Sequence, residues 1–176
     1  MRHNIFYTAH RPLKLALIST CISLDQQHAN ENTNSADVIK KISEVLYIFK
    51  EQIRNESTYI LPIIFDYEPS IWNMYTAQHH KGMNQLRDLE DLISAFKKAE
   101  DEQKAAMISL ISGAYNEFML FNFHHMDDEE EVINEILWRY YKDTYLLEVE
   151  AAFKTLHPAV KQQHATAALT QTATAA

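Results

Sequence analysis

Hydrophobic residues recur along most of the chain at alternating steps of three and four, which is the spacing of one helix face. Polar, turn-prone stretches interrupt this pattern at HANENTNSAD, DYEPS and KKAEDEQ, so four long helices are predicted. The second can begin at a capping Asn or Ser at 34–35, the third at Pro69, and the fourth near Asp101. The fourth runs past Glu131 with a kink, and a short extra helix follows over 144–156. The predicted class is all-α, with four helices packed around one core.

Each predicted helix has an inward-facing line of residues, here called its seam, and every seam contains a polar side chain. The second seam comprises Val38, Ile42, Val45, Phe49, Gln52, Glu56, Tyr59 and Ile63. The third comprises Trp72, Tyr75, His79, Gly82, Leu86, Leu89, Ile93 and Phe96. The fourth comprises Ile108, Ile111, Tyr115, Phe118, Asn122, His125, Glu129, Val132 and Ile136. The first is less regular and comprises His10, Leu13, Leu17, Cys21 and Leu24. The spacing thus selects His79 over its neighbour His80, and His125 over His124.

The polar seam residues are of the types that bind metal ions. An isolated buried carboxylate is strongly disfavoured, whereas a bound cation compensates several carboxylates together. His125 and Glu129 are four residues apart, so both can reach one centre from the same helix face. Imidazole with carboxylate suits iron, manganese or zinc, and the absence of seam thiolates other than Cys21 disfavours a structural zinc site. The simpler alternative is a set of core polar side chains that hydrogen-bond to one another, but the recurrence on four seams favours a metal.

Length and composition narrow the possible functions. The 176 residues, 47% of them hydrophobic, fit one domain with an ample core. Two glycines and four prolines disfavour a sheet-rich fold with many tight turns. The net charge of −8 and the lack of a basic cluster argue against nucleic-acid binding. The acidic run 127–131 is predicted to be a solvated face except at Glu129.

The location and the ends of the domain follow from weaker signals. Cys21 is the single cysteine, so no internal disulfide can form, and this suits a reducing compartment. The apolar run before Cys21 is too short for a signal peptide, and no run approaches the ~18 residues that span a membrane. We therefore expect a cytoplasmic protein. Its domain is predicted to cover residues 1–157, and the low-complexity residues 158–176 are expected to form a mobile tail.

Four stretches, NIFYTAHRPLK, NESTYILPII followed by YEP, AQHHKG and NFHHMDDEEEVINEILWRYYKD, together resemble the hemerythrin-like, or HHE cation-binding, domains. The similarity covers about residues 3–146, and the last stretch is its most specific part. Such domains are up-down antiparallel four-helix bundles that hold a non-haem di-iron centre between histidines from all four helices and two bridging carboxylates. The resemblance implies the same fold here, with iron as the cofactor and metal ligands at His10, Glu56, His79, His125 and Glu129.

Three positions depart from the pattern of the family. Gln52 stands where the family has a histidine four residues before its second-helix carboxylate, and an amide oxygen is a poorer iron ligand than imidazole. Pro12 cannot donate a helical hydrogen bond, so we expect it to displace the first turn together with His10. Met83 stands four residues after His79, where the oxygen carriers have a second histidine. One metal position would keep two histidines and the other one, which leaves an asymmetric, a mononuclear or a vestigial site open.

These features favour a metal-binding protein whose iron site binds or senses dioxygen, nitric oxide, peroxide or iron. The expected partners are small diatomic molecules or peroxide, with neither nucleic acid nor membrane as a partner. A di-iron enzyme with peroxidase-like activity ranks lower, because no part of the sequence indicates a substrate pocket. A metal-free bundle that serves as an interaction or scaffold protein is the other alternative, and Gln52 and Pro12 add weight to it.

Overall fold

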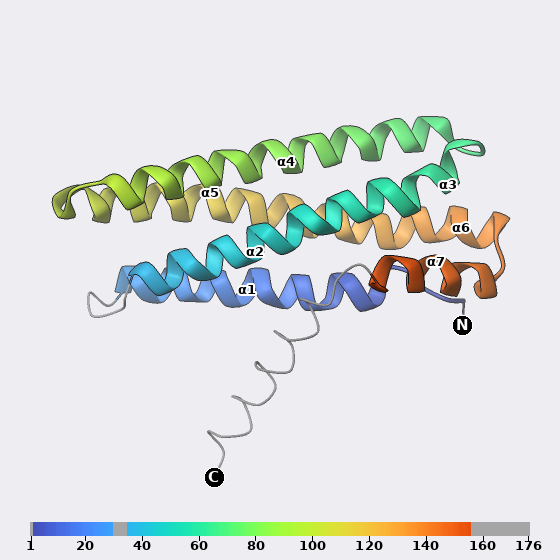
Figure 1. Ribbon diagram of the computed structural model, residues 1–176, viewed down its shortest axis with the longest axis horizontal. Helices are drawn as coiled ribbons and strands as arrows, with labels where there is room; N and C mark the ends of the chain where they lie inside the picture. Colours follow the sequence, from blue (N-terminus) through green and yellow to red (C-terminus); the bar gives the residue numbers. More distant parts are fainter. Residues whose placement is uncertain (1, 30–34, 156–176) are drawn as a thin grey trace, which may run out of the picture.

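The computed structural model describes residues 2–29 and 35–155, which form helices joined by short turns (Figure 1). In chain order the elements, with η marking a π-helical turn, are α1 (Tyr7–Ala29), α2 (Ser35–Asn55), η1 (Glu56–Ile60), α3 (Leu61–Phe65), α4 (Pro69–Lys98), α5 (Asp101–Asp128), η2 (Glu129–Ile133), α6 (Asn134–Tyr140) and α7 (Asp143–Thr155). The described residues contain no strand, so the predicted all-α class is confirmed.

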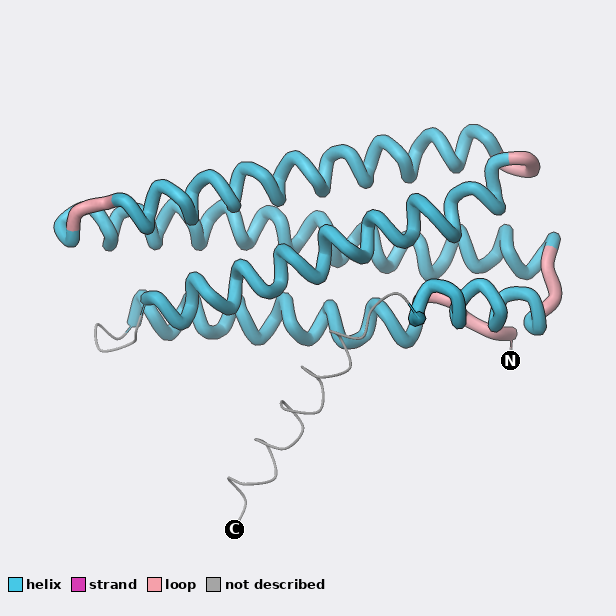
Figure 2. The backbone as a smooth tube through the Cα atoms, in the orientation of Figure 1, coloured by secondary structure: helices cyan, strands magenta, loops and turns pink. Residues whose placement is uncertain are grey.

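Four long helical segments lie side by side (Figures 1 and 2). They are α1, α2 with α3, α4, and α5 with α6, because each π turn joins two helices without a break. Successive segments run in opposite directions, and short loops connect α3 to α4 and α4 to α5. The shorter α7 folds back against the N-terminal segment, where Arg2 Nε donates a 2.6 Å hydrogen bond to Asp143 and the Thr8 hydroxyl donates to Glu150.

The apolar core is divided into two clusters with a polar layer between them. The larger cluster draws residues from α1, α2, α4 and α5, including Leu17, Phe49, Leu86 and Phe118. The smaller cluster lies nearer the N-terminal end of α1 and includes Phe6, Ile60, Tyr75 and Ile133. On α1, His10 stands between Phe6 of the smaller cluster and Leu13 of the larger. The other three segments repeat this order, so the polar layer crosses the whole bundle of segments.

The two π turns change which residues face the core. The seams predict Tyr59, Ile63 and Val132 as inward-facing, but these three side chains are only partly buried. The fully buried residues are their neighbours one position later, Ile60, Ile64 and Ile133. A π turn takes one extra residue, so every position after it advances by one relative to a continuous α-helix. The seams are therefore correct up to Glu56 and Glu129, which begin the two π turns. Beyond them Tyr59, Ile63 and Val132 are shifted out of the core, whereas Ile136 is buried as predicted, beside Leu137.

The predicted helix limits agree with the structure at several points. Pro69 occupies the first turn of α4, where its missing N–H has no intrahelical partner to lose, and Asp101 begins α5. The predicted short helix over 144–156 corresponds to α7. The predicted tail, 158–176, lies outside the described residues. None of the helices in the described ranges is both long and apolar enough to cross a membrane.

Gly113 and Gly82 provide a matched pair for testing how tightly the helices approach. A Cβ at Gly113 would meet no atom within 4 Å, whereas a Cβ at Gly82 would lie 3.3 Å from Ile53 Cδ1 and 3.6 Å from Phe121 Cε1. Gly113→Ala should raise the free energy of unfolding by roughly 0.5–1 kcal/mol, because alanine restricts the unfolded chain and favours the helix. Gly82→Ala should raise the free energy of unfolding by less than Gly113→Ala does, or should lower it. Urea unfolding of both variants checks this, and a lower midpoint for Gly113→Ala would contradict it.

Candidate metal centre

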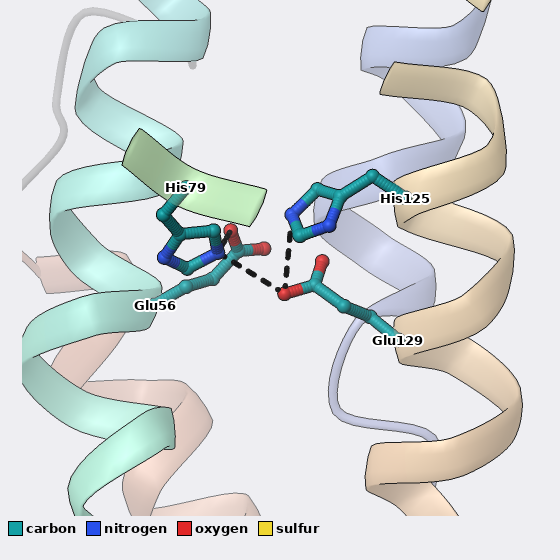
Figure 3. Close-up of side chains that lie close together, drawn as sticks. All are labelled: Glu56, His79, His125 and Glu129. Atoms are coloured by element: carbon teal, nitrogen blue, oxygen red, sulfur yellow. Dashed lines mark hydrogen bonds and ion pairs between the residues drawn. The ribbon is translucent and has the colours of Figure 1, made fainter. Parts of the chain in front are cut away.

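Four buried side chains converge in the polar layer: Glu56, His79, His125 and Glu129 (Figure 3). One ligand atom from each lies within 4.8 Å of the ligand atoms of the other three. They come from η1, α4, α5 and η2, so three of the four long segments contribute. Two imidazoles and two carboxylates at this separation can share one cation. The structure thus provides a buried group that can hold a metal ion.

Imidazole nitrogens lie close to carboxylate oxygens in this group. His79 Nε2 lies 3.3 Å from Glu129 Oε1 and 3.6 Å from Glu56 Oε2. His125 Nε2 lies 3.4 Å from the same Glu129 oxygen. Figure 3 shows both rings directed toward the two carboxylates. The unselected neighbours, His80 and His124, are exposed, so the seam spacing identified the inward-facing histidine of each pair correctly.

The fifth predicted ligand, His10, enters the layer from α1. Its Nε2 lies 3.0 Å from Glu56 Oε1 and 3.5 Å from Glu129 Oε2, while its Nδ1 lies 3.1 Å from Glu130 Oε1. The structure therefore brings all five predicted residues together. Four form the compact group, and His10 lies at its edge, against the outer oxygens of both carboxylates.

Pro12 does not displace His10, contrary to the expectation from the sequence. Pro12 lies inside α1, and His10 is fully buried. The first turn is held instead by the Asn4 side chain, which accepts hydrogen bonds from the backbone N–H groups of Phe6 and Tyr7. Tertiary contacts to Glu56 also fix the position of His10. Because the turn is anchored at both points, α1 tolerates the one backbone hydrogen bond that Pro12 cannot make.

Each of the three histidines has its second ring nitrogen held by a residue outside the group. Glu130 contacts Nδ1 of His10, the Ser57 hydroxyl lies 2.8 Å from Nδ1 of His79, and Gln78 Oε1 lies 2.7 Å from Nδ1 of His125. Outer partners of this kind fix the orientation and tautomer of metal-binding histidines. All three Nε2 atoms are thereby directed at the carboxylates.

Sequence reasoning missed these outer partners for identifiable reasons. Ser57 and Gln78 are each adjacent to a seam residue, and helical periodicity passes over such positions. The prediction of a solvated face was wrong for Glu130, which is partly buried between His10 and Lys14. Its position follows from contacts with α1, which helical periodicity within its own segment does not reveal.

Two buried atoms of the group are left without hydrogen bonds. His125 Nε2 and Glu129 Oε2 are buried and have no hydrogen-bond partner among the described residues. Because Gln78 presents its oxygen to Nδ1 of His125, that nitrogen is the one that carries the hydrogen. Nε2 then holds a lone pair that faces a carboxylate oxygen of Glu129. Two acceptors in contact in a buried site require a cation or a proton between them.

The pKa values of the histidines divide them into two kinds. Burial lowers the pKa of His125 to about 4, and burial also lowers that of His79 although Glu56 opposes it. Both are therefore neutral at pH 7, the form that binds a metal. Burial would also lower the pKa of His10, but hydrogen bonds with Glu130 and Glu56 outweigh it and raise the value to about 9. His10 is thus a buried imidazolium in the absence of a metal.

The pKa values of the two central carboxylates, Glu56 and Glu129, are shifted in opposite directions. Burial raises the pKa of Glu56, but the hydrogen bond and charge of His10 outweigh burial and lower it below its usual range. Burial raises the pKa of Glu129 well above its usual range, and the nearby charge of Glu56 adds to the effect. The hydrogen bond from His10 lowers the pKa of Glu130 to about 2. His10 therefore compensates Glu56 and Glu130 through hydrogen bonds, whereas its charge, 3.5 Å from Glu129 Oε2, only partly offsets the burial of Glu129.

Gln52 lies next to the group, as its place on the seam predicts. Its side chain is 8% exposed, and its Nε2 donates a 2.5 Å hydrogen bond to Glu56 Oε1. Glu56 Oε1 thus accepts hydrogen bonds from both Gln52 and His10. It lies on the side of the carboxylate group away from His79. This side has one imidazole and one amide, whereas the opposite side has the imidazoles of His79 and His125. The asymmetry expected from the sequence is present in the geometry.

No family model, curated protein or solved structure matches the chain. The resemblance to the hemerythrin-like domains therefore stays a prediction. The case for a metal site depends on the residues of this chain, and chiefly on the group of Glu56, His79, His125 and Glu129.

Proposed function

We propose that this protein is a hemerythrin-like metal-binding protein that holds non-haem iron in its polar layer and binds dioxygen, nitric oxide or peroxide there. The proposal is supported by ligand types placed on four antiparallel helical segments at the positions that the family motifs imply. It is supported further by the outer partners Glu130, Ser57 and Gln78, which orient the three histidines.

One observation carries this proposal more than any other: the lone pair of His125 Nε2, which has no hydrogen-bond partner among the described residues, lies 3.4 Å from the carboxylate oxygen Oε1 of Glu129 inside the core. Uncompensated buried acceptors are costly, and a cation between them would satisfy both together with His79 and Glu56. A network that merely satisfied its own polar groups would not leave this pair open. The metal-free scaffold alternative accounts for His10, Gln52 and Glu56, but not for Glu129.

The donor set is compatible with iron, and the resemblance to the hemerythrin-like domains is the reason for choosing iron over manganese. Imidazole and carboxylate donors without thiolate suit iron or manganese, and the Cys21 thiol is engaged elsewhere, with Asn116. Four protein donors leave positions open on an ion that accepts six, and a bound iron could supply reversible binding or redox reaction of a small molecule at those positions. We assign the stronger metal position to His79 and His125, and a weaker second position to His10.

Metal content distinguishes this proposal from the scaffold alternative. Protein loaded anaerobically with Fe²⁺ and passed through a desalting column should retain about one or more irons per chain by elemental analysis. His125→Ala should lower iron affinity by more than the roughly 10–100-fold loss that follows removal of an outer partner, because it removes a direct ligand. His124→Ala, at the exposed adjacent position, is the matched control and should leave the iron content unchanged. Folded wild-type protein without iron, or equal loss in both variants, would overturn the proposal.

A further inference from the structure

A groove of about 420 Å³ opens between the α2–η1 segment and α4. Its apolar walls are formed by Ile53, Leu61, Trp72 and Met83. This volume is in the range of sites that bind small organic molecules, which are typically mostly apolar with a few polar groups. Trp72 offers a large flat surface, and the flexible Met83 can adapt to a ligand's shape.

The groove reaches the outer face of the buried metal group. Ser57 and His79 both line it, and the Ser57 hydroxyl lies 2.8 Å from Nδ1 of His79. Ser57 is exposed while His79 is buried, so this hydrogen bond connects the groove surface to the interior. A molecule seated in the groove would contact Ser57 directly, on the side of His79 opposite to Glu129.

The rim of the groove is cationic in a chain whose net charge is −8. Lys50 and Arg54 line it, and Glu51 is the single acid among its described lining residues. Lys50 lies 3.7 Å from Glu90, and Arg54 lies 4.0 Å from Glu51 with its own side chain 76% exposed. Such solvated pairs are weak, so the Arg54 guanidinium remains available to bind a carboxylate through two hydrogen bonds.

We propose that this groove binds a small carboxylate with an apolar body, and that Ser57 couples its occupancy to metal binding at His79. The carboxylate lies against Arg54 and the Ser57 hydroxyl, and the apolar body lies against Trp72 and Met83. The binding site does not depend on the metal, whereas the coupling rests on the proposed function.

The coupling follows from the hydrogen-bonding capacity of one hydroxyl. Ser57 has one O–H to donate and lone pairs that accept. When its O–H is donated to a carboxylate in the groove, it can only accept from Nδ1–H of His79. The lone pair of His79 is then on Nε2, which faces Glu129 and Glu56 and is the nitrogen placed to bind a metal. The bound carboxylate therefore favours the tautomer that ligates, and metal affinity rises.

Octanoate is a suitable probe, with octanol as its uncharged counterpart. Titrating metal-free protein with octanoate should change the tryptophan fluorescence saturably, with one site per chain, and Trp72→Phe should remove the change. Octanol should bind roughly tenfold or more weakly, because it lacks the charge-assisted hydrogen bonds to Arg54. Arg54→Gln should weaken octanoate binding by a similar factor and leave octanol binding unchanged. Arg87→Gln, outside the groove on α4, should change the affinity for neither molecule.

Three results would overturn the binding site: no saturable signal with octanoate, equal affinity for octanol, or an unchanged octanoate affinity in Arg54→Gln. All three are measured without metal, so they are independent of the proposed iron site. If the wild-type protein binds octanoate but no iron, the proposed function and the coupling are refuted, whereas the octanoate site in the groove is not.

The coupling is measured by repeating an anaerobic Fe²⁺ titration with and without saturating octanoate. Octanoate should raise Fe²⁺ affinity about fivefold or more, the lower end of usual coupling between sites. Ser57→Ala should bind octanoate more weakly, because one hydrogen bond to the carboxylate is lost, so its titrations use octanoate at a concentration that saturates the variant. The difference between the two Fe²⁺ titrations should then disappear, an outcome that a purely structural role of Ser57 would not produce. Equal Fe²⁺ affinities in the two titrations of wild-type protein would overturn the coupling.

Discussion

Glu129→Gln is expected to remove metal binding and, in protein stripped with a chelator, to raise the free energy of unfolding by roughly 1–3 kcal/mol. Both effects have one cause. The charge of His10 only partly offsets the burial of Glu129, so the Glu129 carboxylate is costly when no metal ion is present and strongly attracts a metal ion that enters. A residue that lowers the stability of the metal-free fold in this way is expected at a binding site, where function and stability conflict.

The pH dependence of this effect has a definite sign. In metal-free protein, burial and the charge of Glu56 raise the pKa of Glu129 above its ordinary value of 4.5. A carboxyl group with a raised folded-state pKa stabilises the fold below that ordinary value, and the stabilisation is lost as the pH rises through the folded-state pKa. The wild type and Glu129→Gln should therefore be similar in stability near pH 4.5 and should diverge above it, with the variant the more stable.

Urea unfolding at several pH values, in the presence of a chelator, measures this difference, since titrating groups that do not interact with Glu129 cancel between the two proteins. Glu131→Gln is the matched control, because Glu131 belongs to the same π turn but is exposed. It should leave metal content and stability close to those of the wild type. If Glu129→Gln were less stable than the wild type at pH 8, the carboxylate would have a compensating partner in the metal-free protein, and the case for a cation would fail.

The sequence is sufficient to predict the histidines and glutamates of the polar layer because they do not lie beyond the irregularities of the helices. Continuous three-four spacing of buried residues holds from Tyr75 to Phe96 on α4, and it therefore selects His79 without ambiguity. On the other two segments the spacing holds as far as Glu56 and Glu129, which begin the π turns. Helical periodicity alone thus finds the residues of the site, since each stands where an apolar side chain would be expected.

What the sequence does not predict are the effects of contacts between helices. A π turn has no signature of its own in residue periodicity, so the one-residue shift after Glu56 and Glu129 appears only in the structure. The partners Ser57 and Gln78 were missed because they belong to no seam, and Glu130 was misassigned because its approach to His10 depends on a neighbouring helix. The ability of α1 to accommodate Pro12 likewise depends on Asn4 and on the tertiary contacts of His10.

Gln52→His should convert an asymmetric site into one that holds two irons per chain. Gln52 is buried, four residues before Glu56, and its side chain already contacts that carboxylate. An imidazole there would give the weaker position a second nitrogen donor beside His10. Elemental analysis after anaerobic loading should show iron rising from about one toward two per chain, and exposure to air should produce the charge-transfer absorption of an oxo-bridged pair.

Gln52→His should also be slightly less stable than the wild type when no metal is bound. It removes the hydrogen bond from Gln52 to Glu56, so metal-free Gln52→His should be destabilised by about 1 kcal/mol. Gln103→His, at an exposed position near the start of α5, controls for added surface imidazole and should change neither iron content nor stability. A wild type that already holds two irons would show that Glu130 or water completes the second position without an imidazole. A folded Gln52→His that gains no iron would show that His10, held between Glu56 and Glu130, stays an imidazolium and supports no second metal position.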